Sequence, residues 1–410
     1  MRDVGEATPA AGRLEFVDSL RGFALFGVFW ANLLIFSGIE YLTEGQRASL
    51  LRGRLNTLAY SFGQFFIENK FMGLFSLLFG ISFWLFLSRV TGRAASATGL
   101  FYRRIFWLFV IGAIHGWLLW CFDILRFYAL WAVLLPLFVR TAPKRLLGIA
   151  LAAAVLLPAL VAAANTQVTH PAAPTTGYDA MALAAFSGGS FSEALKANWR
   201  YDWHLTFSIS QIAYQVAIFG RLLLGLCVAR TLDLGNLGGH RRLLRTVLLV
   251  GGLVGVVGSG IVAGNVLTGA GDNPWVAFSR RLLVEGGQLG LTLAYASAMA
   301  LAFLVARWRR VLRLLAAMGQ MALTWYLLQT LFGIWMFYGF AHGPALMGKV
   351  GPAALAAIAV TGYVLQVVLA RAWMTRFRFG PAEWCWRSLT YGKAQPFRLP
   401  ASVTVESVDG

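Results

Sequence analysis

Apolar runs long enough to cross a lipid bilayer recur along nearly the whole chain. A hydrocarbon core about 30 Å thick needs about 20 apolar residues of helix. Only 13% of the 410 residues are charged, against about 25% in soluble proteins. So few charges could not cover the surface of a soluble protein, and the apolar content excludes a disordered chain. We therefore predict an all-α polytopic membrane protein, a bundle of about ten transmembrane helices.

The second of these runs is too long for one straight helix. Glu68, Asn69 and Lys70 interrupt it, so we expect an interfacial or re-entrant piece before the span proper. The loop 165–205 and the tail after residue 376 show no helix signal. The ten predicted spans cover residues 16–38, 57–88, 105–120, 124–139, 146–164, 206–229, 246–268, 284–306, 314–340 and 351–374.

The basic residues predict the orientation of these spans. With the N-terminus in the cytoplasm, 23 of the 35 Lys and Arg fall in cytoplasmic segments, nine fall outside and three lie within spans. This bias is the one that orients membrane proteins. We therefore expect both termini in the cytoplasm. We expect the protein itself in the inner membrane of a bacterium. The predicted regions are an N-terminal transmembrane half (1–164), an extracytoplasmic loop (165–205), a C-terminal transmembrane half (206–374) and a cytoplasmic tail (375–410).

The net charge of +18 does not indicate nucleic-acid binding, because the basic residues lie between apolar runs. We expect membrane lipids as partners and no nucleic acid, and the oligomeric state is left open. Cys121, Cys227 and Cys385 form no C-x-x-C pair and no metal-ligand spacing. No metal site, disulfide framework or covalently bound cofactor is expected.

His115 is the histidine that falls inside a predicted span. Asp123 and Arg126 follow in a tight turn, with Asp123 close enough to fold back toward the imidazole, and Tyr128 starts the next helix. A carboxylate can hold an imidazole in one tautomer and stabilise its charged form. The pair is either a catalytic base with its orienting acid or a buried structural contact. His204, at the start of the sixth span, is the next candidate.

Other polar groups at membrane depth are expected to line a cavity or to pack against neighbouring helices. Arg21 either snorkels to the interface after an acidic helix start or faces the bundle interior, where it could bind a phosphate or carboxylate. The remaining candidates of this kind are Asn32, Glu68, Lys70 and Ser76.

Five stretches together resemble the YeiB-like family, also called domain of unknown function 418. Trp325 and Phe122 depart from the family pattern, which has a smaller polar residue and a glycine at these positions. The matching stretches are VDSLRGFALFG (17–27), KFMGLFSLLFG (70–80), His115 with DIL (123–125) and YAL (128–130), GQMALTWYLLQ (319–329) and FGPAEWCWRSLTYG (379–392).

The resemblance implies a distant similarity to the transmembrane acyltransferases, which use a histidine and cytoplasmic acyl-CoA to acylate a hydroxyl or amine on the far side. Our leading hypothesis is therefore an acyltransferase that uses acyl-CoA as co-substrate and a sugar or lipid-linked glycan as acceptor. In this hypothesis His115 and Asp123 are the catalytic residues, with His115 as general base oriented by Asp123. The alternatives are a transporter of a small polar or amphipathic solute and a structural membrane protein. The further site residues on this reading are Arg21, Asn32, Glu68, Lys70, Ser76, Arg126, Tyr128, His204, Tyr326 and Gln329, with Glu383, Trp384, Trp386 and Arg387 in the tail.

Overall fold

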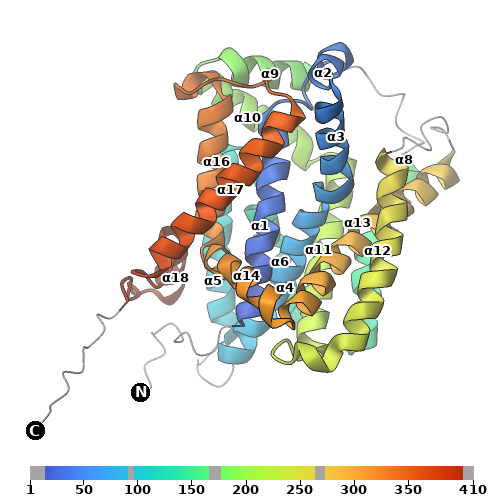
Figure 1. Ribbon diagram of the computed structural model, residues 1–410, viewed down its shortest axis with the longest axis vertical. Helices are drawn as coiled ribbons and strands as arrows, with labels where there is room; N and C mark the ends of the chain where they lie inside the picture. The colour runs from blue at the N-terminus through green and yellow to red at the C-terminus, as the bar shows by residue number, and fades with distance from the viewer. Residues whose placement is uncertain (1–13, 91–96, 166–176, 264–272, 400–410) are drawn as a thin grey trace, which may run out of the picture.

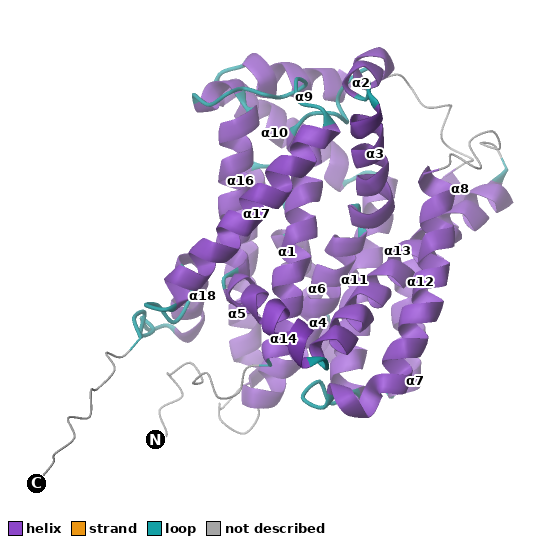
Figure 2. Cartoon of the chain, in the orientation of Figure 1, coloured by secondary structure: helices purple, strands orange, loops and turns teal. Residues whose placement is uncertain are grey.

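The computed structural model describes residues 14–90, 97–165, 177–263 and 273–399. These residues form helices, with no β-sheet in the ranges given (Figures 1 and 2). The all-α class predicted from the apolar runs is confirmed. The α-helices are α1 (Glu15–Phe36), α2 (Glu44–Leu50), α3 (Arg54–Phe62), α4 (Lys70–Val90), α5 (Ala97–Ile114), α6 (Leu125–Ala132), α7 (Pro143–Leu151), α8 (Leu157–Asn165), α9 (Gly177–Gly188), α10 (Phe191–Thr206), α11 (Ile209–Thr231), α12 (Arg241–Ala263), α13 (Pro274–Phe303), α14 (Ala306–Leu312), α15 (Ala316–Gln320), α16 (Ala322–Phe337), α17 (Pro352–Met374) and α18 (Pro381–Tyr391).

Seven helical segments of the described chain are long and apolar enough to cross a membrane. The pair α13 and α14–α15 bends by 118° and gives up to one more, and α16 is apolar but short. The protein is therefore a multi-pass membrane protein, while the count of ten stays a prediction. The seven segments are Glu15–Phe36, Arg54–Val90, Ala97–Leu119, Pro143–Ala164, Ile209–Thr231, Leu237–Ile261 and Pro352–Met374.

Two regions expected to lack helices contain them. The loop 165–205 holds α9 and α10, and the tail holds α18. These helices are amphipathic or short, so a search for long apolar runs passes over them. The first 13 residues and the last 11 lie outside the described residues.

The predicted interruption of the second span is present at Asn69. Its φ is +61°, in the left-handed region that short polar side chains such as asparagine tolerate. A π-helical stretch (Gly63–Ile67) follows α3, and α4 starts anew at Lys70. The helix is therefore broken here, within a segment, Arg54–Val90, that still reads as one candidate span.

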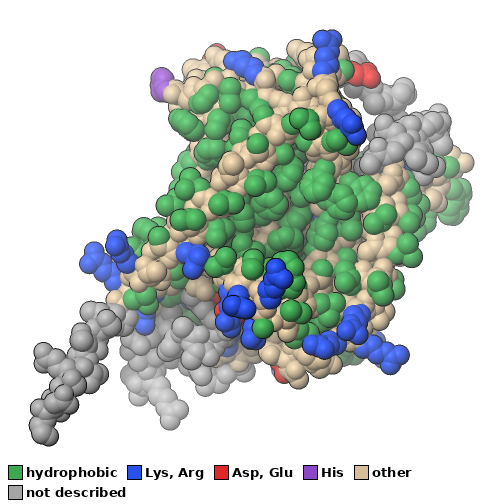
Figure 3. Space-filling view, in the orientation of Figure 1, with side chains coloured by type: hydrophobic (Ala, Val, Ile, Leu, Met, Phe, Trp, Pro, Cys, Tyr) green, Lys and Arg blue, Asp and Glu red, His purple; other side chains and the backbone are tan. Residues whose placement is uncertain are grey.

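The bundle has two ends with different contents. Figure 1 shows α2 and α9 at one end, here the α9 end, and α14 and α18 at the other, here the α18 end. In Figure 3 the middle of the visible face is covered with hydrophobic side chains, and the Lys and Arg side chains gather toward the two ends. The start of α1 lies at the α18 end, where Glu15 pairs with Arg313 at 2.7 Å.

Glycines let α1 and α15 cross in close contact. A Cβ on Gly22 would lie 2.2 Å from the carbonyl oxygen of Leu315, and one on Gly319 would lie 1.8 Å from that of Asp18. Small residues at helix crossings are a common device of membrane bundles. This crossing brings the backbone of α15 beside Arg21 and so builds one wall of the site.

Candidate functional site

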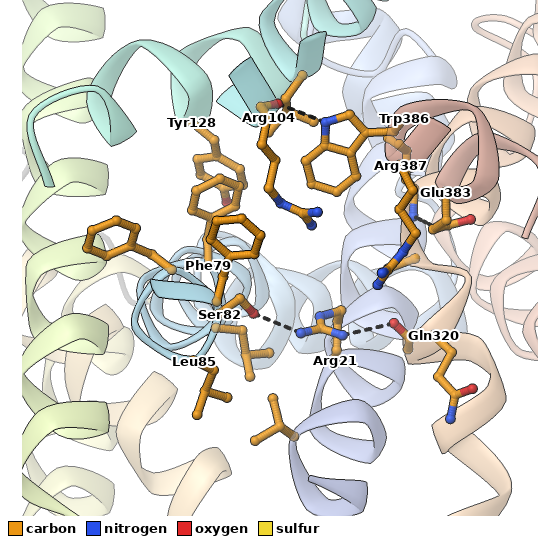
Figure 4. Close-up of a pocket in the computed structure, with 18 of the residues that line it drawn as sticks. Arg21, Phe79, Ser82, Leu85, Arg104, Tyr128, Gln320, Glu383, Trp386 and Arg387 are labelled. Carbon is orange, nitrogen blue, oxygen red and sulfur yellow. Dashed lines mark hydrogen bonds between the residues drawn. The ribbon is translucent and has the colours of Figure 1, made fainter. Parts of the chain in front are cut away.

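A cavity of about 270 Å³ opens into the α18 end of the bundle. Its walls come from the start of α1, α4 from Phe75 onward, α5, α6, α15, α16 and α18. The greater part of the wall is aromatic or aliphatic. Figure 4 shows Arg21, Arg104 and Arg387, from three different helices, with their guanidinium groups directed into the same space. The cavity therefore combines an apolar lining with a cationic entrance.

Positively charged side chains outnumber negatively charged ones in the lining of the cavity. Four arginines line the cavity, Arg21, Arg89, Arg104 and Arg387, against two carboxylates, Asp18 and Glu383. Asp18 is paired with Arg21 at 2.9 Å. An arginine fork suits phosphate and carboxylate groups, so the entrance fits an anionic head group.

Arg21 takes the second of the two positions considered from the sequence, with its guanidinium inside the bundle. It donates to Ser82 Oγ at 2.8 Å and to the carbonyl oxygen of Gly319 at 3.1 Å. These contacts tie α1 to α4 and α15 at the cavity wall.

Helix α18 closes one side of the cavity through Trp386 and Glu383. The guanidinium of Arg104 lies 3.7 Å from the centre of the Trp386 ring, and the Trp386 indole donates to the Arg104 carbonyl oxygen at 2.8 Å. Such a cation–π contact holds both side chains in place. Trp384 instead donates to the Gln395 carbonyl oxygen, within the tail.

Glu383 caps helix α16 from 60 residues away. Its Oε1 accepts from the backbone amides of Leu323 at 2.6 Å and Thr324 at 3.1 Å, and its Oε2 accepts from the Thr324 hydroxyl. Helix α16 has no capping side chain of its own, so the distant carboxylate serves its unpaired amides. Burial raises the pKa of Glu383, and these hydrogen bonds offset part of that shift. The tail is thus fixed to the helix that carries the inner part of the site.

The inner end of the cavity is lined by Tyr128 and Tyr326. The Tyr128 hydroxyl lies 3.0 Å from Ser76 Oγ. The Tyr326 hydroxyl lies 3.4 Å from Asp123 Oδ1, and its ring centre is 5.0 Å from that of His115. Tyr326 therefore stands between the cavity and the histidine.

His115 and Asp123 make the direct contact expected from their spacing. His115 Nδ1 lies 2.8 Å from Asp123 Oδ1. A π-helical stretch (His115–Leu119) widens the end of α5 at this point, and such bulges are frequent at functional sites. His115 Nε2 lies 2.9 Å from the hydroxyl of Thr330 on α16. The three side chains are buried, with His115 only 1% exposed.

A buried ion pair connects this cluster to helix α10. Arg126 donates to Asp202 of α10 through both terminal nitrogens, and its backbone amide donates to Asp123 Oδ2 at 2.9 Å. Asn198, also on α10, accepts from the Cys121 amide and donates to the Gly116 carbonyl oxygen at 2.8 Å. Helix α10 is therefore fastened directly over the hairpin that carries His115.

Other candidates from the sequence lie away from this cluster. Lys70 donates to the Gln64 carbonyl oxygen, and Gln329 donates to Gln366 of α17 at 2.8 Å. Asn32 is buried in α1, and Glu68 lies beside Gln64 in the break before α4. His204 is exposed on α10 and is not part of the His115 contacts.

Several residues of the site were missed from the sequence: Ser82, Arg104, Asn198, Asp202 and Thr330. Arg104 and Asp202 fall outside the predicted spans, where a solvated role is the usual expectation, whereas the structure places them in α5 and α10. Thr330 lies one turn after Tyr326 and directly after a matched stretch, which was the available signal.

The fold and this site define a class: a multi-pass helical membrane protein with a cationic cavity at one end and a buried His–Asp pair at its inner limit. A family model described as "Protein of unknown function (DUF418)" matches residues 228–393. The uncharacterized protein YxaH of Bacillus subtilis (strain 168) is 29% identical over 95% of this chain and 97% of its own. The uncharacterized protein YeiB of Escherichia coli (strain K12) is 26% identical over 93% and 97%.

A third relative, an uncharacterized 39.9 kDa protein in the amylase 3' region of Bacillus acidopullulyticus, is 27% identical over 94% of this chain and 96% of its own. The relatives match nearly end to end. Together with the family model, they support the resemblance to the YeiB-like DUF418 family that the sequence shows.

Proposed function

We propose that this protein is an integral membrane acyltransferase of the cytoplasmic membrane. It would take an acyl group from cytoplasmic acyl-CoA and transfer it to an extracytoplasmic hydroxyl or amine acceptor, a sugar or a lipid-linked glycan. The observation that carries the proposal is the cavity, which opens at the arginine-lined α18 end and ends at Tyr326, the residue in contact with both His115 and Asp123.

The parts of such a donor correspond to parts of the cavity. The nucleotide phosphates would meet Arg104 and Arg387 at the entrance, with Arg21 behind them. The acyl chain would lie along the phenylalanines of α4, among them Phe75, Phe79 and Phe83. His115 would act as general base, held by Asp123. Arg126 and Tyr128 would support this arrangement through Asp123 and Ser76.

Purified full-length protein in lipid nanodiscs tests the proposal. Binding and CoA release are measured with acetyl-, octanoyl- and palmitoyl-CoA, with and without sugar acceptors. We expect saturable binding and CoA release for at least one chain length. His115→Ala should bind the donor and lose release. Absence of binding and of release for every chain length would contradict the proposal.

A transporter is the second candidate, favoured by a buried ion pair deep in the bundle. Arg221 and Glu285 are each 1% exposed, with Arg221 Nη2 2.9 Å from Glu285 Oε2, and Arg281 also pairs with this carboxylate. Charged groups at membrane depth often mark a solute or proton path. Uptake of an acyl-CoA or a smaller anion into sealed vesicles, without CoA release, would favour this function.

A further inference from the structure

The Nε2 atom of His115, the ring nitrogen that does not contact Asp123, faces a hydroxyl of the protein itself. In a direct transfer, Nε2 would be directed at the incoming acceptor. Here it lies 2.9 Å from Thr330 Oγ1, while Nδ1 lies 2.8 Å from Asp123 Oδ1. Carboxylate, imidazole and hydroxyl in this order form the arrangement by which an adjacent base activates a hydroxyl nucleophile.

The hydrogen bonds assign the proton positions. Asp123 Oδ1 accepts from the Tyr326 hydroxyl and Oδ2 from the Arg126 amide, which is the bonding of an ionised carboxylate. The proton shared with Asp123 therefore belongs to His115 Nδ1. In the neutral imidazole, Nε2 is then the acceptor and the Thr330 hydroxyl is its donor.

The Thr330 hydroxyl makes only a long contact with its own helix. Thr231, Thr361 and Thr390 donate to the carbonyl oxygen four residues earlier at 2.8, 2.7 and 2.7 Å. The corresponding distance for Thr330, to Tyr326, is 3.4 Å. Its hydroxyl is thus drawn away from its own helix and toward the imidazole.

The cavity ends one helical turn from Thr330. Tyr326 lines the cavity and precedes Thr330 by four residues, a rise of about 6 Å along α16. Thr330 is fully buried, so an acyl carbonyl reaches it only when the Tyr326 ring moves. The Tyr326 hydroxyl is held by two long contacts, 3.4 Å to Asp123 Oδ1 and 3.3 Å to the Ile124 amide, which favours such a movement.

We propose that Thr330 is the nucleophile that carries the acyl group as an ester between donor and acceptor. This inference rests on the proposed acyltransferase function. Thr330 Oγ1 attacks the thioester carbonyl and passes its proton to His115 Nε2. The carbon–sulfur bond breaks, and the CoA thiolate leaves with that proton. The acceptor hydroxyl or amine then gives its proton to His115, attacks the ester carbonyl and releases Thr330, which takes the proton back.

Isotope exchange tests the covalent step without any acceptor. Wild-type protein in nanodiscs is mixed with acyl-CoA and labelled free CoA, because an acyl-enzyme returns its acyl group to the label. Acid quenching followed by mass spectrometry of peptides then locates the ester. We expect exchange, and an acyl mass increase on the peptide that contains Thr330.

Three variants separate a chemical role from a structural one. Thr330→Val keeps the shape but lacks the hydroxyl, and should reduce exchange at least 100-fold and lose the adduct. Thr330→Ser keeps the hydroxyl and should retain both. Thr361→Val, which removes an exposed hydroxyl of α17, should behave as wild type.

Two results would overturn the assignment, and they differ. Transfer to an acceptor by wild type without exchange, retained within twofold in Thr330→Val, would mean direct transfer; the proposed function would then stand without Thr330. Failure of every acyl-CoA to bind or release CoA would remove the proposed function and this inference together.

Discussion

At the scale of single residues, the buried carboxylate decides which imidazole nitrogen carries the proton. Asp123→Asn keeps the size of the side chain and removes its charge. Its amide can donate to His115 Nδ1, which would leave the proton on Nε2, the wrong side for a base. We expect turnover to fall about 100- to 1,000-fold, while His115→Ala abolishes it. Steady-state CoA release, read beside thermal melting, checks this.

The outcome that contradicts this role is a structural one. If both substitutions lower the melting temperature and leave the activity per folded molecule nearly unchanged, the pair only stabilises the hairpin. Tyr102→Phe serves as control, because its hydroxyl makes only a long contact, 3.4 Å to the Val133 carbonyl oxygen, away from the site.

Short-range contacts were predictable from the sequence, and long-range ones were not. His115 and Asp123 are eight residues apart across one turn, so chain geometry alone brings them together. Thr330 lies 215 residues beyond His115, and its approach depends on how α16 packs. A single sequence holds no measure of that packing, and the same reason hides Asp202 as the partner of Arg126.

At the scale of helices, the crossing of α1 and α15 depends on Gly22. A methyl group there would lie 2.2 Å from the Leu315 carbonyl oxygen, so the two backbones would have to move apart. Overpacking of this kind costs about 1–3 kcal/mol. We expect Gly22→Ala to lower the melting temperature and weaken donor binding, since the Arg21 contact to Gly319 lies in this crossing.

A matched variant controls for the change of residue type. Gly148 lies inside α7 with no atom within 4 Å of an added Cβ. Gly148→Ala should leave stability unchanged or raise it by about 0.5–1 kcal/mol, because alanine favours helix. Equal melting temperatures for the two variants would remove the argument that the crossing is tight.

The most apolar helices were the ones that the sequence predicted most accurately. The long runs that became α1, α11 and α17 were placed within a few residues. Helices α10 and α18 were missed because they are amphipathic, and their buried residues include polar ones such as Asn198, Asp202 and Glu383. Their sequence carries charges at a density that resembles a loop, and only their contacts, such as Glu383 with Leu323, show their role.

At the scale of the whole molecule, the start of α1 and helix α18 lie at the same end. Glu15 pairs with Arg313, and Arg21 of α1 and Arg387 of α18 line one cavity. A segment that starts and ends on one side of a membrane, as the described chain from α1 to α18 does with respect to the bundle, crosses it an even number of times. This agrees with the split of 23 to nine basic residues, which predicts that side to be the cytoplasm.

The native cysteines allow a direct test of this orientation. Cys385 of α18 is exposed, whereas Cys121 and Cys227 are buried, so Cys385 reports on the tail without any substitution. A membrane-impermeant maleimide should label it in inside-out vesicles and not in spheroplasts. In a Cys385→Ser background, Ser192→Cys at the exposed start of α10 should show the opposite pattern.

Labelling of Cys385 in intact spheroplasts would place the cavity entrance outside the cell. Cytoplasmic acyl-CoA could not then reach Arg104 and Arg387, and the proposed direction of transfer would be wrong.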